Sequence, residues 1–290
     1  MNRKDFISLS GLGFLGLYAC GTSTVMNNRK PLAIQLYTIR DAIAENLERS
    51  LERLAELGFQ QLEIYGYDGK FFGKTRTEFQ SILKNTGLEV ISSHHTTGIL
   101  HNSNGTLLNN WEKSVEDLHF IGSRYMVCSY LFEEERTLEH YKKLPELLNQ
   151  SGEITNKSGI DFAYHNHDFE FEIMDDKTVY DFILDNTDSD LVKMELDLYW
   201  ISKAGYNPLA YFEKYPKRFP LWHVKDMKAG TKDFAEVGNG TIDFKTIFEA
   251  KEKAGLKYWF LEQDSSDKDI FESIRISKDY VQKNRYFQQL

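Results

Sequence analysis

The sequence predicts an α/β protein in which eight parallel strands and their surrounding helices form one (β/α)8 TIM barrel. From residue 31 onward, short apolar runs alternate with longer amphipathic stretches, which is the pattern of repeated strand–helix units. The first run is followed by Tyr37-Thr38-Ile39-Arg40-Asp41, without the glycine-rich phosphate turn that usually marks a doubly wound open sheet. The length of 290 residues also fits one barrel, since such domains run to about 250 residues.

Eight apolar runs predict the strands of the barrel. They lie at residues 32–37, 61–65, 89–94, 125–130, 160–165, 191–197, 221–225 and 258–262. Cys128 falls within the fourth run, where core packing is its expected role.

Amphipathic stretches between these runs predict the helices. In the first, residues 43–57, leucines recur at helical spacing, and Gly58 follows where a helix C-cap is expected. The other predicted helices are residues 78–85, 110–121, 138–157, 178–186, 208–214 and 245–254.

The N-terminal segment has the features of an export signal. Arg3 and Lys4 precede an apolar stretch at residues 6–18, and Leu17-Tyr18-Ala19-Cys20 resembles a bacterial lipoprotein cleavage box. We therefore expect a signal peptide at residues 1–20 with Cys20 lipidated, a flexible tether at 21–30 and the barrel at 31–290. A simple signal peptide or a buried first helix are the alternatives. The protein is expected to be exported, as a periplasmic or membrane-anchored bacterial lipoprotein.

Composition and charge narrow the classes of partner. The 41% hydrophobic and 27% charged fractions are typical of a soluble globular protein. The formal net charge of −9 disfavours a nucleic-acid partner, because no basic stripe offsets it. A small neutral or weakly charged molecule is the better candidate for a substrate.

Polar residues close four consecutive predicted strands. They are His165, Asp197, His223 and Glu262. Active sites of (β/α)8 barrels lie at the C-terminal ends of the strands, so these side chains should converge. Imidazoles and carboxylates from neighbouring strands would bind one divalent cation, with Mn²⁺ as first choice and Zn²⁺, Co²⁺ or Mg²⁺ as alternatives.

Three residues are candidates for the fourth ligand. His165 and His167 lie two apart and share a strand face, and Glu170 could return from the following loop. Position favours His165, which leaves His167 as a candidate acid or base. Each polar residue could instead merely cap a strand at a wet barrel rim.

Several further residues are expected to shape the pocket. Lys225 could stabilise a developing oxyanion, or serve only as a structural partner of Asp226 or Glu262. Asp243 is expected to cap a helix after the loop that contains Gly238 and Gly240. The candidate substrate contacts are His94, Tyr37, Tyr65 and Trp200, and Tyr199 is a further aromatic candidate.

Taken together, these motifs resemble the xylose isomerase-like TIM barrels, a superfamily that includes sugar phosphate isomerases and epimerases and the endonuclease IV nucleases. The likeness covers residues 31 to about 281, and its most telling pieces are YHNHDFEF at 164–171, LD at 196–197, HVKD at 223–226, VGNGTIDF at 237–244 and LEQD at 261–264.

The resemblance implies a metal held by Glu, Asp, His and Glu, of which the last three match Asp197, His223 and Glu262. His165 stands where the family's first glutamate would be. In the epimerase pattern two glutamates move a proton beside a carbonyl, and this chain would keep only Glu262, assisted by His167 and Lys225.

The resemblance therefore implies a sugar isomerase or epimerase, with β-elimination from 3-keto-glycosides as the alternative. A nuclease is disfavoured, because the endonuclease IV family carries further histidine ligands that this chain lacks. At the corresponding positions this chain has Trp200, Met227 and Lys228. A non-catalytic sugar-binding lipoprotein is the alternative from another class.

Overall fold

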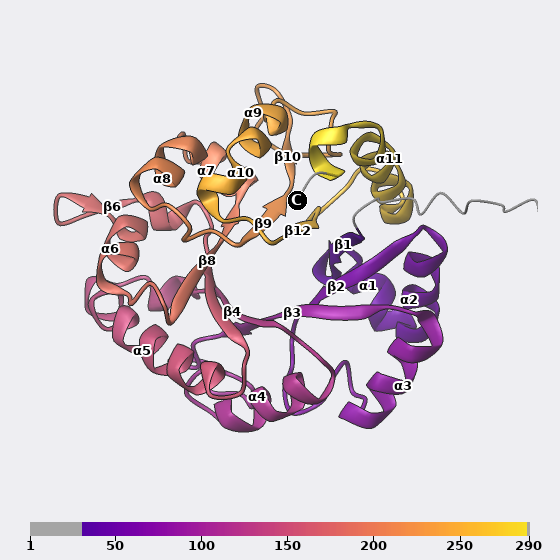
Figure 1. Cartoon of the computed structure of the whole chain (residues 1–290), viewed down its shortest axis with the longest axis horizontal. Coiled ribbons are helices and arrows are strands. Elements are labelled where there is room, and N and C mark those ends of the chain that lie inside the picture. Colours follow the sequence, from indigo (N-terminus) through magenta and orange to yellow (C-terminus); the bar gives the residue numbers. More distant parts are fainter. Residues whose placement is uncertain (1–30, 289–290) are drawn as a thin grey trace, which may run out of the picture.

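Eight parallel strands close into a barrel in the structure, a computed structural model that describes residues 31–288 (Figure 1). The predicted fold class is thus confirmed. Going round the barrel, the strands are β1 (Leu32–Gln35), β2 (Phe59–Ile64), β3 (Glu89–Thr96), β4 (Tyr125–Tyr130), β5 (Asp161–His165), β8 (Val192–Asp197), β9 (Leu221–Val224) and β12 (Tyr258–Leu261). Pairing of Ile34 with Leu261 joins β12 back to β1 and closes the barrel.

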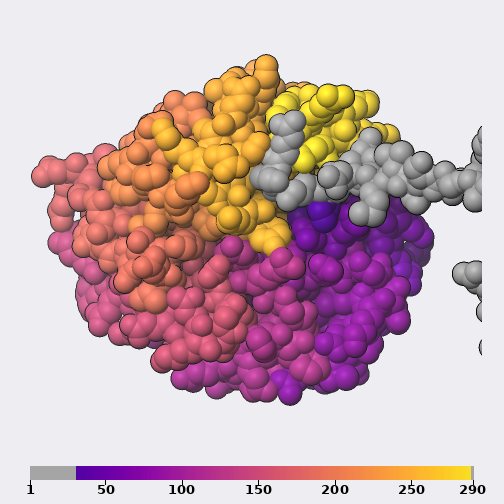
Figure 2. All heavy atoms as spheres, viewed as in Figure 1, coloured from indigo at the N-terminus to yellow at the C-terminus, as the bar shows by residue number. Residues whose placement is uncertain are grey.

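Helices surround the barrel on its outer side. They are α1 (Arg40–Glu45), α2 (Leu47–Glu56), α3 (Arg76–Thr86), α4 (Trp111–Phe120), α5 (Leu138–Asn156), α6 (Val179–Asn186), α7 (Leu198–Lys203), α8 (Pro208–Lys214), α9 (Phe244–Glu249), α10 (Lys251–Ala254) and α11 (Ile270–Lys283). Helix α2 contacts α11, because the guanidinium of Arg53 lies over the ring of Phe271. Figure 2 shows the indigo start and the yellow end of the described chain on the same side of the molecule.

The predicted helices at residues 43–57 and 245–254 are each two helices. Asn46 interrupts the first with an extended backbone (φ −160°), because its side chain accepts the N–H of Arg49 and so caps α2. The helices α7 and α11, the short hairpins β6 (Ile173–Met174) with β7 (Lys177–Thr178) and β10 (Asp226–Met227) with β11 (Phe234–Ala235), and four 3-10 turns were not predicted. The turns are η1 (Leu36–Ile39), η2 (Glu133–Glu135), η3 (Phe169–Phe171) and η4 (Arg285–Gln288).

The barrel interior carries an apolar layer beneath the polar strand ends. This layer is made of Ala33, Ile91, Tyr125, Val127, Ala163, Leu221 and Phe260, with Tyr258 packed against it. His165, His223 and Glu262 each follow a member of this layer by two residues, so alternation along the strand keeps them on the same inward face. The apolar layer thus fills the bottom of the barrel and leaves the polar side chains at its mouth.

A bulge in β3 decides which histidine faces the interior. Leu62 of β2 pairs with Val90, but the next residue, Glu63, pairs with Ser92, so one residue of β3 is passed over. Such a bulge changes the phase of the strand that contains it. His94 consequently turns its Nε2 toward Glu195, while Nδ1 of His95 contacts the Gly105 carbonyl.

The loop after β9 is fixed by one carboxylate. Asp226 accepts the backbone N–H groups of Gly238, Gly240 and Ile242. A Cβ on Gly240 would lie 2.2 Å from Oδ1 of Asp226, which explains the glycine at that position. As predicted, Asp243 caps α9 by accepting from Thr246.

Cys128 is fully buried and free, in agreement with its predicted packing role. The signal segment, its Cys20 and the tether at residues 21–30 lie outside the described residues. Within residues 31–288, no helix has both the length and the apolar character needed to cross a membrane.

Candidate metal centre

The four predicted ligands come together at the mouth of the barrel. His165, Asp197, His223 and Glu262 each place one donor atom within 4.8 Å of the others, and all four are buried. Nδ1 of His223 lies 2.7 Å from Oε2 of Glu262 and 3.6 Å from Oδ2 of Asp197. Nε2 of His165 lies 3.5 Å from the same Asp197 oxygen. We call these four residues the ligand cluster.

Hydrogen bonds orient both imidazoles of the ligand cluster. Nδ1 of His165 lies 3.2 Å from the Ser129 carbonyl oxygen, which can only accept, so Nδ1 carries the hydrogen and Nε2 has the free lone pair. Nε2 of His223 lies 2.5 Å from Oε2 of Glu63, which leaves Nδ1 toward Glu262. A ligating histidine typically donates its second N–H to a carbonyl or carboxylate in this way.

One unpartnered atom tests whether the cluster fits a cation. Nε2 of His165 is buried and forms no hydrogen bond among the described residues. Buried polar atoms are rarely left without a partner, because that costs about 1–3 kcal/mol each. Oδ2 of Asp197 forms an ion pair with Nζ of Lys225 at 3.1 Å, and Oδ1 is occupied by the Trp200 N–H at the start of α7. The donor set and the free lone pair of His165 therefore fit a divalent cation.

Lys225 lies beside the ligand cluster and is 1% exposed. Its Nζ is 2.7 Å from Glu262, 3.1 Å from Asp197 and 3.0 Å from Asp264. Burial opposes the charge of Lys225, but the carboxylates of Asp197, Asp264 and Glu262 raise its pKa well above the usual value. Of the two partners considered from sequence, Glu262 pairs with Lys225, whereas Asp226 holds the loop.

The charges of the cluster keep its carboxylates ionised. Burial alone would raise the pKa of Glu262, but Lys225 and His223 bring it far below its usual value. Burial likewise opposes ionisation of Asp197, and Lys225 with His165 lowers its pKa. Oε2 of Glu262 takes the contacts from both His223 and Lys225. Oε1 forms no hydrogen bond among residues 31–288, although Glu262 borders the cavity described next.

A cavity of about 910 Å³ opens above the ligand cluster. Its wall includes all four predicted substrate contacts, Tyr37, Tyr65, His94 and Trp200. Tyr37 and Tyr65 meet edge to face with ring centroids 5.2 Å apart. Tyr199 does not line the cavity. Its hydroxyl donates to the Lys232 carbonyl and its ring packs against Phe234.

His167 lines the cavity but lies outside the ligand cluster. Its ring stacks on Phe169 and contacts Trp200. Burial lowers the pKa of His167 well below its usual value, and the neighbouring His165 and Lys225 lower it further, so the imidazole is neutral.

Glu170, the third possible ligand, is held in a separate pocket. It accepts from the Tyr164 hydroxyl and the His167 N–H, at 2.7 and 2.8 Å. Burial raises its pKa to about 7. The geometry thus brings His165, and neither His167 nor Glu170, into the ligand cluster.

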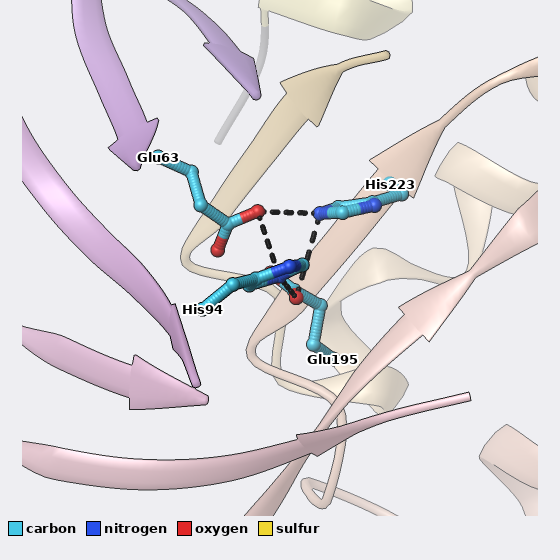
Figure 3. A group of neighbouring side chains, drawn as sticks. All are labelled: Glu63, His94, Glu195 and His223. Carbon is cyan, nitrogen blue, oxygen red and sulfur yellow. Dashed lines mark hydrogen bonds and ion pairs between the residues drawn. The ribbon is translucent and has the colours of Figure 1, made fainter. Parts of the chain in front are cut away.

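A second group of side chains meets below the first. Glu63 of β2, His94 of β3, Glu195 of β8 and His223 of β9 point toward one another inside the barrel (Figure 3). We call these residues the Glu63 cluster. His223 belongs to both clusters, with Nδ1 facing the ligand cluster and Nε2 facing Glu63.

Glu63 and Glu195 were not predicted as site residues from the sequence. One pattern could have indicated them, because each acidic residue stands between two apolar residues within a predicted strand. Glu63 lies between Leu62 and Ile64, and Glu195 lies between Met194 and Leu196. Glu195 also lies two residues before Asp197 and so shares its inward face. A fully buried carboxylate inside a strand must find partners, and the opposite wall of the barrel supplies them.

The sequence profile of one family matches most of this chain. Residues 51–280 match the family described as Xylose isomerase-like TIM barrel. The chain belongs to this family.

Two kinds of activity are named among proteins that are similar to this chain. The inosose dehydratase of Geobacillus kaustophilus is 22% identical over 81% of this chain and 86% of its own length. That of Clostridium beijerinckii is 28% identical over 54% of this chain, and the match spans 58% of the relative. A sugar phosphate isomerase/epimerase from Parabacteroides distasonis is 28% identical, with a TM-score of 0.77 over 91% of this chain and 97% of that structure.

A more distant structure shares the fold. The IOLI protein, solved with a bound zinc atom, has a TM-score of 0.70 at 15% identity, over 90% of this chain and all of the other. At that identity the likeness concerns the fold alone.

Proposed function

We propose that this protein is a divalent-cation-dependent sugar isomerase or epimerase that moves a proton on the carbon beside a carbonyl group. The observation that carries the proposal is the convergence of His165, Asp197, His223 and Glu262 at the floor of an aromatic-walled cavity. The similar isomerase/epimerase structure from Parabacteroides distasonis supports the same class of reaction.

His165, Asp197, His223 and Glu262 would hold the cation. A bound divalent cation supplies a Lewis acid that polarises the substrate carbonyl and offsets the negative charge that develops on its oxygen. Two imidazoles among the four ligands favour Mn²⁺, Zn²⁺ or Co²⁺ over Mg²⁺, which prefers oxygen ligands.

The proton is moved by side chains that border the cavity. Oε1 of Glu262, which has no hydrogen-bond partner among the described residues, accepts the proton from the substrate carbon. Lys225 fixes the other oxygen of that carboxylate at 2.7 Å and so orients it. The neutral imidazole of His167 is the second group that can give or take a proton.

The aromatic wall binds and shields the sugar. Tyr37, Tyr65 and Trp200 offer ring faces and edges that suit the apolar face of a pyranose. The cavity volume of about 910 Å³ also admits a substrate larger than one sugar ring.

A β-elimination is the second candidate reaction. It begins with the same proton removal, but the electron pair then expels a group from the next carbon and forms a carbon–carbon double bond. Two observations favour it: the chain has one carboxylate base where the epimerase pattern needs two, and its curated relatives include inosose dehydratases. A ketosugar, such as a 3-keto-glycoside, would be the substrate.

Incubation of the metal-loaded protein with sugars and keto-glycosides in D2O tests the proposal. We expect deuterium beside the carbonyl of the recovered sugar, measured by mass spectrometry and NMR, because the abstracted proton exchanges with solvent. Release of a leaving group together with an unsaturated product identifies elimination instead. Glu262→Gln should slow either outcome by about 100-fold or more.

Two results would contradict this assignment. Product that retains the substrate hydrogen would exclude proton abstraction. Sugar affinity that is unchanged after metal removal, with no turnover of any sugar, would support a non-catalytic binding protein.

We also propose that Cys20 is lipidated and anchors the protein to a membrane. The support is the run of Arg3, Lys4, an apolar stretch and the Leu17-Tyr18-Ala19-Cys20 box. In a bacterial host, the wild type should incorporate a labelled fatty acid and sediment with membranes, and Cys20→Ser should do neither. Equal sedimentation of both forms, without label, would refute the anchor.

A further inference from the structure

The Glu63 cluster has the donor set of a cation site. Two carboxylates and two imidazoles from four strands each place one donor atom within 4.8 Å of the others (Figure 3). Nε2 of His94 is 2.7 Å from Glu195 and 3.1 Å from Glu63. Nε2 of His223 is 3.4 Å from the same oxygen of Glu195. Tetrahedral Zn²⁺ with bonds of about 2.0–2.1 Å separates its ligand atoms by about 3.3 Å, so a small expansion would admit the ion.

The cluster lacks the basic residue that the ligand cluster has. Glu63 and Glu195 are fully buried, and among the described residues neither forms an ion pair with a lysine or an arginine. Lys225, by contrast, lies beside the ligand cluster and pairs with Glu262. Two buried carboxylates are costly unless positive charge accompanies them. In the metal-free protein protons on His94 and His223 can supply that charge, and one divalent cation would bring the same two charges in their place.

Each carboxylate also has an unused oxygen. Oε1 of Glu63 and Oε1 of Glu195 are buried and have no hydrogen-bond partner among residues 31–288. Oε2 of Glu63, by contrast, takes the contacts from Gln35 and from both histidines. The atoms that face the histidines are the Oε2 atoms, so a cation would satisfy the free Oε1 atoms by binding both oxygens of each carboxylate.

We propose that Glu63, His94 and Glu195 hold a second divalent cation, with His223 shared between the two clusters. His223 can serve both because its two ring nitrogens face in different directions. When both cations are bound, the proton that lies between Nε2 and Glu63 in the metal-free protein is released to solvent, so each nitrogen of the resulting imidazolate offers one lone pair. The other three members of each cluster differ, so the two cations can be removed separately. This inference does not depend on the reaction proposed above.

The position of the second site predicts how its cation exchanges. Of the four members, only His94 borders the cavity, while Glu63, Glu195 and His223 are fully buried. A cation there must pass His94 to reach solvent. The second cation should therefore be lost to a chelator more slowly than the first.

Cobalt titration of the chelator-treated full chain tests the proposal. We expect the wild type to bind two equivalents of Co²⁺, measured by elemental analysis after gel filtration and by visible absorption. Glu195→Gln should bind one equivalent, and His165→Ala should keep the slowly released equivalent. Glu170→Gln is the matched control, since it removes another buried carboxylate that belongs to neither cluster, and it should bind two.

The counts can overturn the proposal in three ways. One equivalent in the wild type would exclude a second site. Two equivalents in Glu195→Gln would place the second cation elsewhere. Loss of both equivalents from Glu195→Gln with a native near-UV CD spectrum would indicate one indivisible centre. Glu63→Gln carries the same expectation as Glu195→Gln and replaces it if that variant does not fold.

Discussion

His165→Ala should abolish turnover and weaken cation binding at the ligand cluster by about 100-fold or more. The imidazole is held by the Ser129 carbonyl with its free Nε2 toward Asp197, so its removal takes one donor atom from the ligand cluster. The measurement is cation affinity by titration together with steady-state kinetics on any substrate that exchanges deuterium.

Three variants separate the possible fourth ligands. His167→Ala should keep the cation and lose activity, because His167 lines the cavity but lies outside the ligand cluster. Glu170→Gln should keep both the bound cation and the activity. His165→Glu should bind the cation, since it introduces at this position the carboxylate that the resemblance implies. Full cation affinity and activity in His165→Ala would contradict the assignment and leave His167 or Glu170 as the ligand.

Lys225→Met should destabilise the metal-free protein by about 3–5 kcal/mol, because it leaves the buried charges of Asp197 and Glu262 without their lysine. In a domain of this size such a loss lowers the melting temperature by about 10 °C. A bound cation brings replacement charge to the same two carboxylates, so the loss should shrink when the protein is metal-loaded. Thermal unfolding with and without Mn²⁺ measures both values.

Lys228→Met is the matched control for this substitution. Lys228 pairs with Asp267 at the surface, where the side chains are 43% and 87% exposed, so the change should cost less than about 0.5 kcal/mol. Equal destabilisation of metal-free and metal-loaded Lys225→Met would contradict the electrostatic explanation. It would point instead to the lost contacts of the lysine Nζ with the rings of Tyr199 and Trp200.

Periodicity predicted the barrel well because it is local. The observed strands match the eight apolar runs to within a few residues, and the predicted helix at residues 208–214 is α8. The predicted boundaries of helices were wrong where a side chain accepts a hydrogen bond from the nearby backbone. Asn46 divides the first helix, and Asp197 ends β8 and caps α7 with the same carboxylate.

The meeting of His165, Asp197, His223 and Glu262 could be predicted from the order of the polar strand ends, because parallel strands present their C-terminal ends at one mouth. The side chains that face these four residues across the barrel could not be predicted in this way. The contact of Glu63 with His223 spans 160 residues of sequence and depends on barrel closure. The contact of His94 with Glu195 depends on the β3 bulge. Register and closure are set by packing across the whole barrel, which no single strand encodes.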